Sequence, residues 1–373
     1  MVRILDGQGD FIFTSAGIAG RLSASVALDM PDVAFSGSFA LEINSTGLAA
    51  TLIPLVGDPI EIPSGPYLRI SGTDVDLQIM GQILSGNFLL EVVMTDSSAR
   101  VISIAATGVH LFLGDDGGTP DHAEDADDVG VRVQGAEGLI VITATGMAGQ
   151  IGGSVSLHGI SGVDFGSDID IALNTMSTTI QETVNLADED IILDLPAGPY
   201  LCIQATNFDL SIEGQTLHGD FAIEQRVNEA GESILRIAAT HVEFTLGDGS
   251  SDYITLTQGQ GSFVLKNTGL AGELRGTVVV DIPGVSVTGT LVLQINQTGD
   301  AINELFEVGD TNVLLNLPAG EGAYIKVAGL GVEIEMLGQT LSGDFRFQYN
   351  TMAGEVRMEV ENVVIAIGDG DTD

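Results

Sequence analysis

The sequence predicts an all-β protein: an elongated tandem array of three mainly antiparallel β repeat units, packed in sandwich-like or solenoid-like layers. Three observations support this fold class. One block of residues recurs three times along the chain. Apolar and polar residues alternate with a period of two, and turn-forming residues separate the alternating stretches at short intervals.

The recurring block reads Gly-Gln-x-Leu-x-Gly-x-Phe and begins at Gly81, Gly214 and Gly338. Its first glycine stands where a strand must reverse, which favours a positive φ angle. Its second glycine lies inside the following strand and predicts a bulge or a close sheet contact. About eight short strands are expected in each repeat. The predicted repeats are residues 1–128, 129–252 and 253–373.

The alternation is clearest in residues 74–79, where Val and Leu follow Asp at every second position. Such a pattern is typical of strands with one buried and one solvated face. Residues 332–336 and 344–348 show the same pattern. Residues 301–306 instead suggest a short helical turn.

The two ends of the sequence share one phase of the repeat. Phe263 aligns with Phe11, and Gly247 aligns with Gly368, so that the chain holds three whole repeats. This phase predicts either a segment cut from a longer array or a subunit that stacks head to tail. In both cases the expected partner is the protein itself, through neighbouring repeats or neighbouring subunits, because exposed sheet edges favour pairing.

The charge excludes several classes of partner. The chain has 52 acidic and 12 basic residues, which gives a formal net charge of −40. Such a surface repels nucleic acid and anionic membranes and attracts cations. No apolar run is long enough for a spanning helix, so membrane insertion is not expected. Cys202 is the only cysteine, so an intrachain disulfide cannot form.

An acidic Gly-Asp loop closes the last long strand of each repeat. Glycine allows such a loop to curl, and carboxylates at nearby positions supply the oxygen ligands that Ca²⁺ prefers. The sequence therefore predicts calcium sites, with solvated acidic turns as the alternative. The candidate ligands are Asp115, Asp116, Asp121, Asp248, Asp252, Asp369, Asp371 and Asp373.

No catalytic constellation recurs with the repeat. His218 aligns with Ser85 and Ser342, and Cys202 aligns with Arg69 and Lys326. No metalloprotease, nucleophile-elbow or phosphate-loop motif is present. The sequence thus predicts a protein that is not an enzyme.

Two further positions report a repeated turn. Asn44 and Asn296 align with each other and match the glycosylation pattern. A turn that recurs with the repeat explains both of them.

Residues 16–24, Asp29–Pro31 and 35–39, with Pro196–Tyr200 and Leu246–Gly249, resemble the long tandem-repeat regions of giant secreted or cell-surface bacterial proteins. These proteins are adhesin-like, often acidic and associated with calcium. The resemblance covers the whole chain and implies an extracellular or cell-surface location and a structural or adhesive role. It carries over no catalytic residue.

The predicted function is that of a structural repeat segment in the stalk of an extracellular surface adhesin, or of a self-assembling extracellular fibre, stiffened by calcium. One alternative is a carbohydrate- or host-ligand-binding module, for which the acidic loop 115–128 is the candidate site. A second alternative is a lipid-binding β-groove, which requires an open, concave and apolar face.

Overall fold

The computed structural model consists of β-strands and turns, and contains no helix among the residues it describes. Those residues are 2–30, 33–55, 57–79, 82–94, 100–115, 128–212, 214–227, 232–247, 251–282, 285–320, 322–350 and 355–367. The all-β prediction is therefore confirmed.

Eighteen of the described strands belong to one antiparallel sheet. The long strands contain 12 to 16 residues, so the expectation of short strands is wrong. They are β1 (Val2–Thr14), β2 (Gly17–Met30), β3 (Val33–Asn44), β6 (Tyr67–Ile79), β7 (Gln82–Met94), β8 (Arg100–Asp115), β9 (Val129–Thr143), β10 (Gly146–His158), β11 (Val163–Asn174), β14 (Tyr200–Ile212), β15 (Gln215–Val227), β16 (Ser233–Gly247), β17 (Asp252–Lys266), β18 (Gly269–Ile282), β19 (Val285–Asn296), β22 (Tyr324–Met336), β23 (Gln339–Asn350) and β24 (Glu355–Ala366).

Three short hairpins complete the fold: β4 (Ala50–Leu52) with β5 (Ile60–Ile62), β12 (Ile180–Leu186) with β13 (Glu189–Leu195), and β20 (Ile302–Val308) with β21 (Thr311–Leu317). Each follows a long strand, namely β3, β11 or β19. The helical turn expected at 301–306 is wrong, because these residues form β20, whose alternate side chains are buried against the sheet. The predicted three-repeat organisation and its sandwich-like or solenoid-like layering stay predictions.

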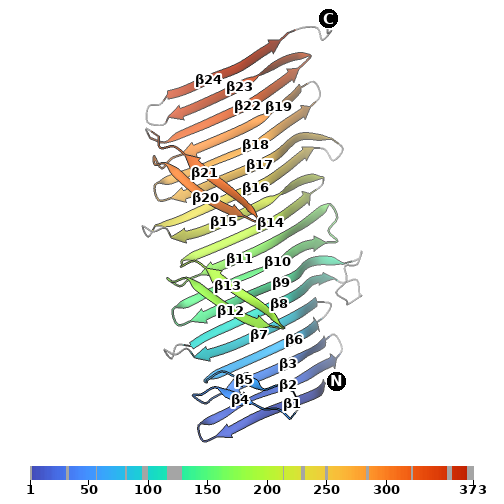
Figure 1. Cartoon of the computed structure of the whole chain (residues 1–373). Helices are drawn as coiled ribbons and strands as arrows, with labels where there is room; N and C mark the ends of the chain where they lie inside the picture. Colours follow the sequence, from blue (N-terminus) through green and yellow to red (C-terminus); the bar gives the residue numbers. More distant parts are fainter. Residues whose placement is uncertain are drawn as a thin grey trace. The chain divides into compact units, whose positions relative to one another are not determined.

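The chain divides into two compact units. The N-terminal unit contains Met1–Ile160 and Asp170–Leu201, and the C-terminal unit contains Ser161–Ile169 and Cys202–Asp373. In the N-terminal unit the antiparallel pairings run β1–β2, β2–β3, β3–β6, β6–β7, β7–β8, β8–β9 and β9–β10. In the C-terminal unit they run from β15 through β16, β17, β18, β19, β22 and β23 to β24 (Figure 1).

A line of β-bulges crosses the strands of each unit. At nine bulge positions φ lies between 50° and 58°, in the left-handed region. Residues of this conformation shift the register and bend the strand. Most of the nine are Gly, Asn, Asp or His, the types that adopt it most readily. They are Asp6, Asp74, Gly108, Gly135, Asn207, His241, Gln258, Gly331 and Asn362.

The second glycine of the recurring block lies on this same line. Gly86 has a φ of 143°, and the register of β7 against β8 shifts between Ser85 and Asn87. Gly219 and Gly343 stand at matching register shifts. The predicted bulge is therefore confirmed at all three positions.

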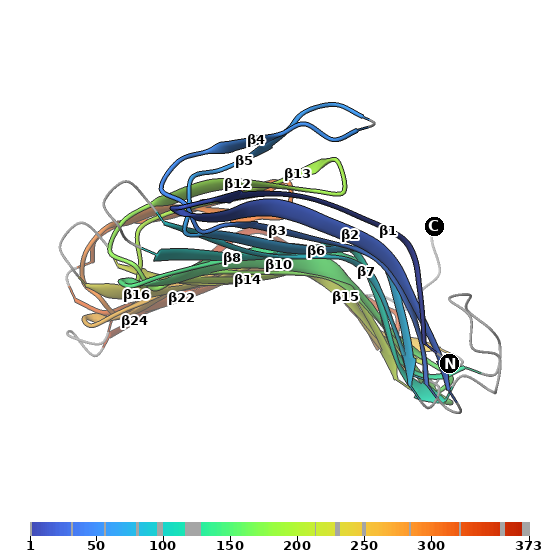
Figure 2. The same ribbon diagram turned by 90° about the horizontal axis from the view of Figure 1, so that it is seen from below.

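Each hairpin lies on the convex side of the bend that these bulges produce (Figure 2). Hairpin β20–β21 buries Phe306, Val308, Val313 and Leu315 against Ala238 and its neighbours on the sheet. In the N-terminal unit, hairpin β12–β13 buries Val184, Leu186, Leu193 and Leu195. The opposite, concave side has no covering layer among the described residues.

A buried asparagine fixes the base of every hairpin. The side-chain amide of Asn174 donates hydrogen bonds to the backbone oxygens of Thr178 and Pro196, at 2.9 Å and 2.7 Å. Its side-chain oxygen accepts a 2.8 Å bond from the backbone N–H of Met176. Asn44 and Asn296 form the equivalent three bonds, so the repeated turn predicted at these two positions is confirmed.

Candidate functional site

The concave face of the N-terminal unit is a surface of apolar side chains. Cross-strand partners point to the same face of a sheet, so the register defines rows of residues that run across the strands. Ile70 and Ile104, in the middle of one row, are 42% and 41% exposed, which shows that solvent reaches this face. That row contains Leu22, Leu41, Ile70, Leu90, Ile104 and Ile140.

The C-terminal unit presents the same kind of face. Val327 and Phe347 are each 44% exposed in the middle of its strands. Two rows of this face carry no charged side chain. They consist of Ile237, Phe263, Gly272, Ile295, Ile325 and Tyr349, and of Ala239, Gly261, Leu274, Leu293, Val327 and Phe347.

The apolar surface continues beyond the bulges onto the second arm of each bent sheet. In the C-terminal unit a row on this arm contains Val280, Val287, Ile334, Leu341 and Ile365. The neighbouring positions of the same strands face the convex side and are polar, as in Thr288, Glu333 and Ser342. On this arm of the C-terminal unit an apolar concave row therefore lies opposite polar convex positions.

A shallow hollow of about 240 Å³ lies at the bend of the N-terminal unit. Phe88 and Ile104 from one arm and Val109 from the other arm contribute to its wall, together with Ile140 and Ile151. These side chains supply aliphatic and aromatic carbon and almost no polar surface. The hollow therefore suits an apolar group.

Polar side chains on the convex side hold the bulges. The backbone N–H of Gly331 donates a 2.7 Å hydrogen bond to Oδ1 of Asp344, and Nδ2 of Asn362 donates a 2.9 Å bond to Oδ2. These bonds lower the pKa of the Asp344 carboxyl, because they favour its ionised form. Asn207 and Asp220 form the equivalent backbone bond at 2.9 Å. Fixed bulges keep the bend, and with it the concave face, in one shape.

The hairpin of the C-terminal unit is attached by an ionic network. The Glu304 carboxylate on β20 lies 3.3 Å from Arg226, 3.9 Å from Arg236 and 3.7 Å from Lys266. Arg236 also donates a hydrogen bond to the backbone oxygen of Leu305 and stacks over the Phe306 ring at 4.4 Å. One sheet arginine thus binds the backbone, a carboxylate and a ring of the covering hairpin.

At the base of the first hairpin, Tyr67 packs with Leu52 and Ile62. Its phenol donates to the carboxylates of Glu91 and Glu42, at 3.2 Å and 3.4 Å. Burial, and then the two negative charges, raise the pKa of Tyr67 above its ordinary value.

The structure describes only two of the predicted calcium ligands. Asp115 ends β8 opposite Val129, and Asp252 begins β17 opposite Gly247, so each lies where two long strands meet at an acidic loop. The described residues contain no group of three or more His, Cys, Asp or Glu side chains that could hold a metal ion. The other candidates, which lie outside the described residues, are Asp116, Asp121, Asp248, Asp369, Asp371 and Asp373.

Two histidines and the single cysteine have structural surroundings. The Nδ1 atom of His241 lies 2.8 Å from Oδ2 of Asp220, at one of the bulges. Nε2 of His158 lies 2.8 Å from the Ser156 hydroxyl. Cys202 is buried in β14. The prediction that the chain is not an enzyme stays a prediction.

Comparison with known proteins finds no matching family model, no similar curated protein and no similar solved structure. In the part of the chain that the structure describes, no helix has the length and hydropathy to cross a membrane.

The sequence predicts that one face of these strands is apolar, but not that this concave face is open. The alternation of Val75 and Leu77 with Asp74 and Asp76 correctly separates an apolar from a polar face. It also led to the expectation that the apolar face is buried, which holds for Val75, at 8% exposure, but not for Ile70 of the same strand, at 42%, because the covering hairpins pack on the opposite face. The signal that could have identified an open face is the excess of apolar strand positions over the few hairpin residues able to cover them.

Proposed function

We propose that the chain is a repeat-built β-sheet that binds apolar chains, such as the acyl chains of lipids, along its concave face. The observation that carries this proposal is the set of uncharged rows on that face, typified by Ile70, Ile104, Val327 and Phe347. Monomeric soluble proteins rarely expose contiguous apolar surfaces of this extent, and such surfaces mark binding sites.

The residue types favour acyl chains over a polar ligand. The rows contain branched aliphatic and aromatic side chains and offer no charge, and the Tyr349 hydroxyl is their one side-chain hydrogen-bond donor, so they give little specificity for sugars or peptides. A bound acyl chain loses its contact with water in proportion to the area covered, about 0.8 kcal/mol for each CH₂ group. Its polar head group remains in water at the rim.

The test is a titration with a fluorescent C16 fatty acid. The variants Ile104→Lys and Ile237→Lys place a charge on the concave face of each unit, and each should weaken binding at least tenfold. Ile192→Lys is the matched control, because Ile192 lies on the hairpin strand β13 and is 67% exposed. Equal affinity for all four proteins, or no binding by the parent protein, would contradict the proposal.

A structural role is the second candidate. The chain would form a repeat segment of an extracellular adhesin stalk or a self-assembling fibre, located outside the cell or on its surface, with calcium at the Gly-Asp loops. The observation that favours it is the order of the elements, since a hairpin follows β3, β11 and β19 alike and left-handed bulges occur in β6, β14 and β22. This order supports a tandem of three repeats.

Thermal unfolding with Ca²⁺ and with a chelator tests the calcium part of this candidate, and electron microscopy of the same samples tests the fibre. A melting temperature raised by several degrees in Ca²⁺ supports clamps at Asp115, Asp252 and their neighbouring loops. An unchanged melting temperature indicates solvated turns. Extended filaments support self-assembly, which the acyl-chain proposal neither requires nor excludes.

A further inference from the structure

Strand β24 carries an arginine, Arg357, at the repeat position where the arginine of β16, Arg236, binds a hairpin. In the C-terminal unit, Arg236 on β16 bonds the covering hairpin through the Leu305 oxygen and Glu304. Arg357 has the same position on β24: the two align in the repeat, and Arg357 lies opposite Gln348 as Arg236 lies opposite Glu224. Arg357 pairs with β23 through the backbone ladder, but its side chain forms no hydrogen bond or ion pair with any residue that the structure describes.

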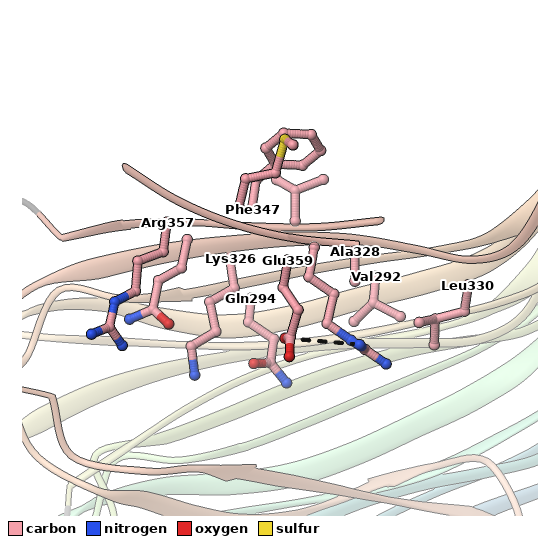
Figure 3. Close-up of a pocket in the computed structure, with 12 residues that line it drawn as sticks. Val292, Gln294, Lys326, Ala328, Leu330, Phe347, Arg357 and Glu359 are labelled. Carbon is pink, nitrogen blue, oxygen red and sulfur yellow. Dashed lines mark ion pairs between the residues drawn. The ribbon is translucent and has the colours of Figure 1, made fainter. Parts of the chain in front are cut away.

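Arg357 borders a groove of about 720 Å³ on the convex face of β19, β22, β23 and β24. Lys326 and Arg346 also line it, so 3 of the 12 basic residues of this acidic chain gather there. Figure 3 shows Arg357, Lys326 and Gln294 on one side of the strands, with Phe347 on the other. Arg346 is paired with Glu361 at 2.8 Å and with Glu359 at 3.8 Å.

The first hairpin has the complementary properties. Apolar side chains near its tip are exposed: Ile53 by 80% and Leu55 completely. Asp58 lies in the same loop and is exposed. The hairpin lies near β1 and β3 at its base. A loop that carries the Asp58 carboxylate beside exposed apolar residues matches a groove lined by three cations.

The edge strands also match each other. Among the described residues β1 pairs only with β2, and β24 only with β23. Large apolar side chains are exposed along both strands: Phe13 by 73%, Val356 by 67% and Met358 by 64%. The internal junctions β8–β9 and β16–β17 are antiparallel, and they pair Ile104 with Ile140 and Ile237 with Phe263. In the repeat, Met358 aligns with the first residue of each pair, and Phe11 aligns with the second.

We infer that two copies of this chain associate head to tail, with β24 of one copy pairing antiparallel with β1 of the next. The register places Met358 opposite Phe11 and Ile365 opposite Ile4. The hairpin β4–β5 of the second copy lies over the groove of the first, with Asp58 near Arg357. This inference rests on the self-assembling fibre proposed above and names the contact that would build it.

Cysteine crosslinking tests the register in the full chain, with Cys202→Ser as the background. Phe11→Cys combined with Met358→Cys should form disulfide-linked dimers and longer ladders under mild oxidation. Phe11→Cys combined with Ile365→Cys is the control, because the same register separates these two positions by the bend. Equal ladders from both pairs, or none from the first, would overturn the register.

Charge reversal tests the hairpin contact. In sedimentation velocity at low salt, Asp58→Arg and Arg357→Asp should each weaken association at least tenfold, and the double variant should restore it. Asp188→Arg, at the tip of hairpin β12–β13, should have no effect. A parent protein that stays monomeric at all concentrations contradicts the association itself.

The two proposals can fail separately in these samples. Fatty-acid binding by Asp58→Arg and Arg357→Asp should equal that of the parent protein, since both substitutions lie away from the concave face. If the filaments described above form but the crosslinks and the charge swap fail, the fibre stands and the proposed contact is wrong. Association that is lost in Ile104→Lys instead would mean that copies meet through the concave face, and would also overturn this contact.

Discussion

The side chain of Asn174 joins the two ends of hairpin β12–β13, because its amide bonds Pro196 at 2.7 Å, directly after the second strand of the hairpin. Asn174 is fully buried, and its side-chain oxygen accepts a hydrogen bond from the backbone N–H of Met176. This amide ties the end of β11 to both ends of the hairpin. The same arrangement at Asn44 and Asn296 makes it a general device of the fold.

We expect Asn174→Ala to destabilise the N-terminal unit by about 1–3 kcal/mol, because it leaves buried backbone groups without partners. Urea unfolding measures this loss, and hydrogen exchange should show it first in residues 180–195. Asn185→Ala is the control, since the Asn185 side chain bonds only the exposed Asp190 side chain among the described residues, and its backbone oxygen, which accepts a bond from Arg69, is kept in the variant. Equal losses for the two variants would show that the amide does not anchor the hairpin.

Replacing a glycine at a left-handed bulge should destabilise the protein even where an added side chain meets no steric clash. A Cβ atom at Gly331 would touch nothing, yet φ there is 57°. Gly331→Ala should therefore cost about 1–2 kcal/mol through backbone strain alone. Gly166→Ala is the matched control, because Gly166 also has free space but lies outside the left-handed region. Urea unfolding of the two variants measures the difference, and equal stabilities would contradict the bulge geometry.

Tyr67 predicts a loss of stability at alkaline pH. Burial and the carboxylates of Glu91 and Glu42 raise its pKa in the folded state above the value in the unfolded chain. The stabilising contribution is therefore complete below about pH 10 and is lost as the pH rises further, when the unfolded chain ionises first. The free energy of unfolding should fall more steeply between about pH 9 and 11 for the parent protein than for Tyr67→Phe. Parallel curves would mean that Tyr67 ionises normally.

The ionic network of the second hairpin gives a further prediction. Arg236→Met removes the cation that binds Glu224, Glu304 and the Leu305 oxygen, and should destabilise the C-terminal unit by roughly 3 kcal/mol. Arg275→Met, whose guanidinium bonds the Gln260 side chain, is the control and should change stability little. Thermal unfolding measures both variants. A small effect of Arg236→Met would indicate that apolar burial alone holds the hairpin.

Features of the fold that depend on local sequence pattern could be predicted from the sequence. Alternation at residues such as Val75 and Leu77 separates the two faces of a strand, and the aligned Asn44 and Asn296 indicate the turns. The position of β20 could not be predicted in this way. Its alternating residues Ile302, Phe306 and Val308 fit a strand of the main sheet equally well, and only tertiary packing places them across it.

The local sequence pattern also could not predict that the concave face is open to solvent. Ile104 and Ala105 are neighbours in β8, but hairpin β12–β13 packs on the face of Ala105, which is 2% exposed, whereas Ile104 is 41% exposed. No local rule decides which apolar face receives a cover. The calcium prediction rests on loops that lie almost entirely outside the described residues, so it stays a prediction.

The most direct measurement of the central claim is photo-crosslinking with a diazirine-labelled C16 fatty acid, followed by peptide mass spectrometry. The account predicts labels on concave positions such as Ile70, Ile104, Val327 and Phe347, which excess unlabelled fatty acid should abolish. Labels confined to the convex hairpins, at Ile192 or Leu314, or no competed label at all, would contradict it.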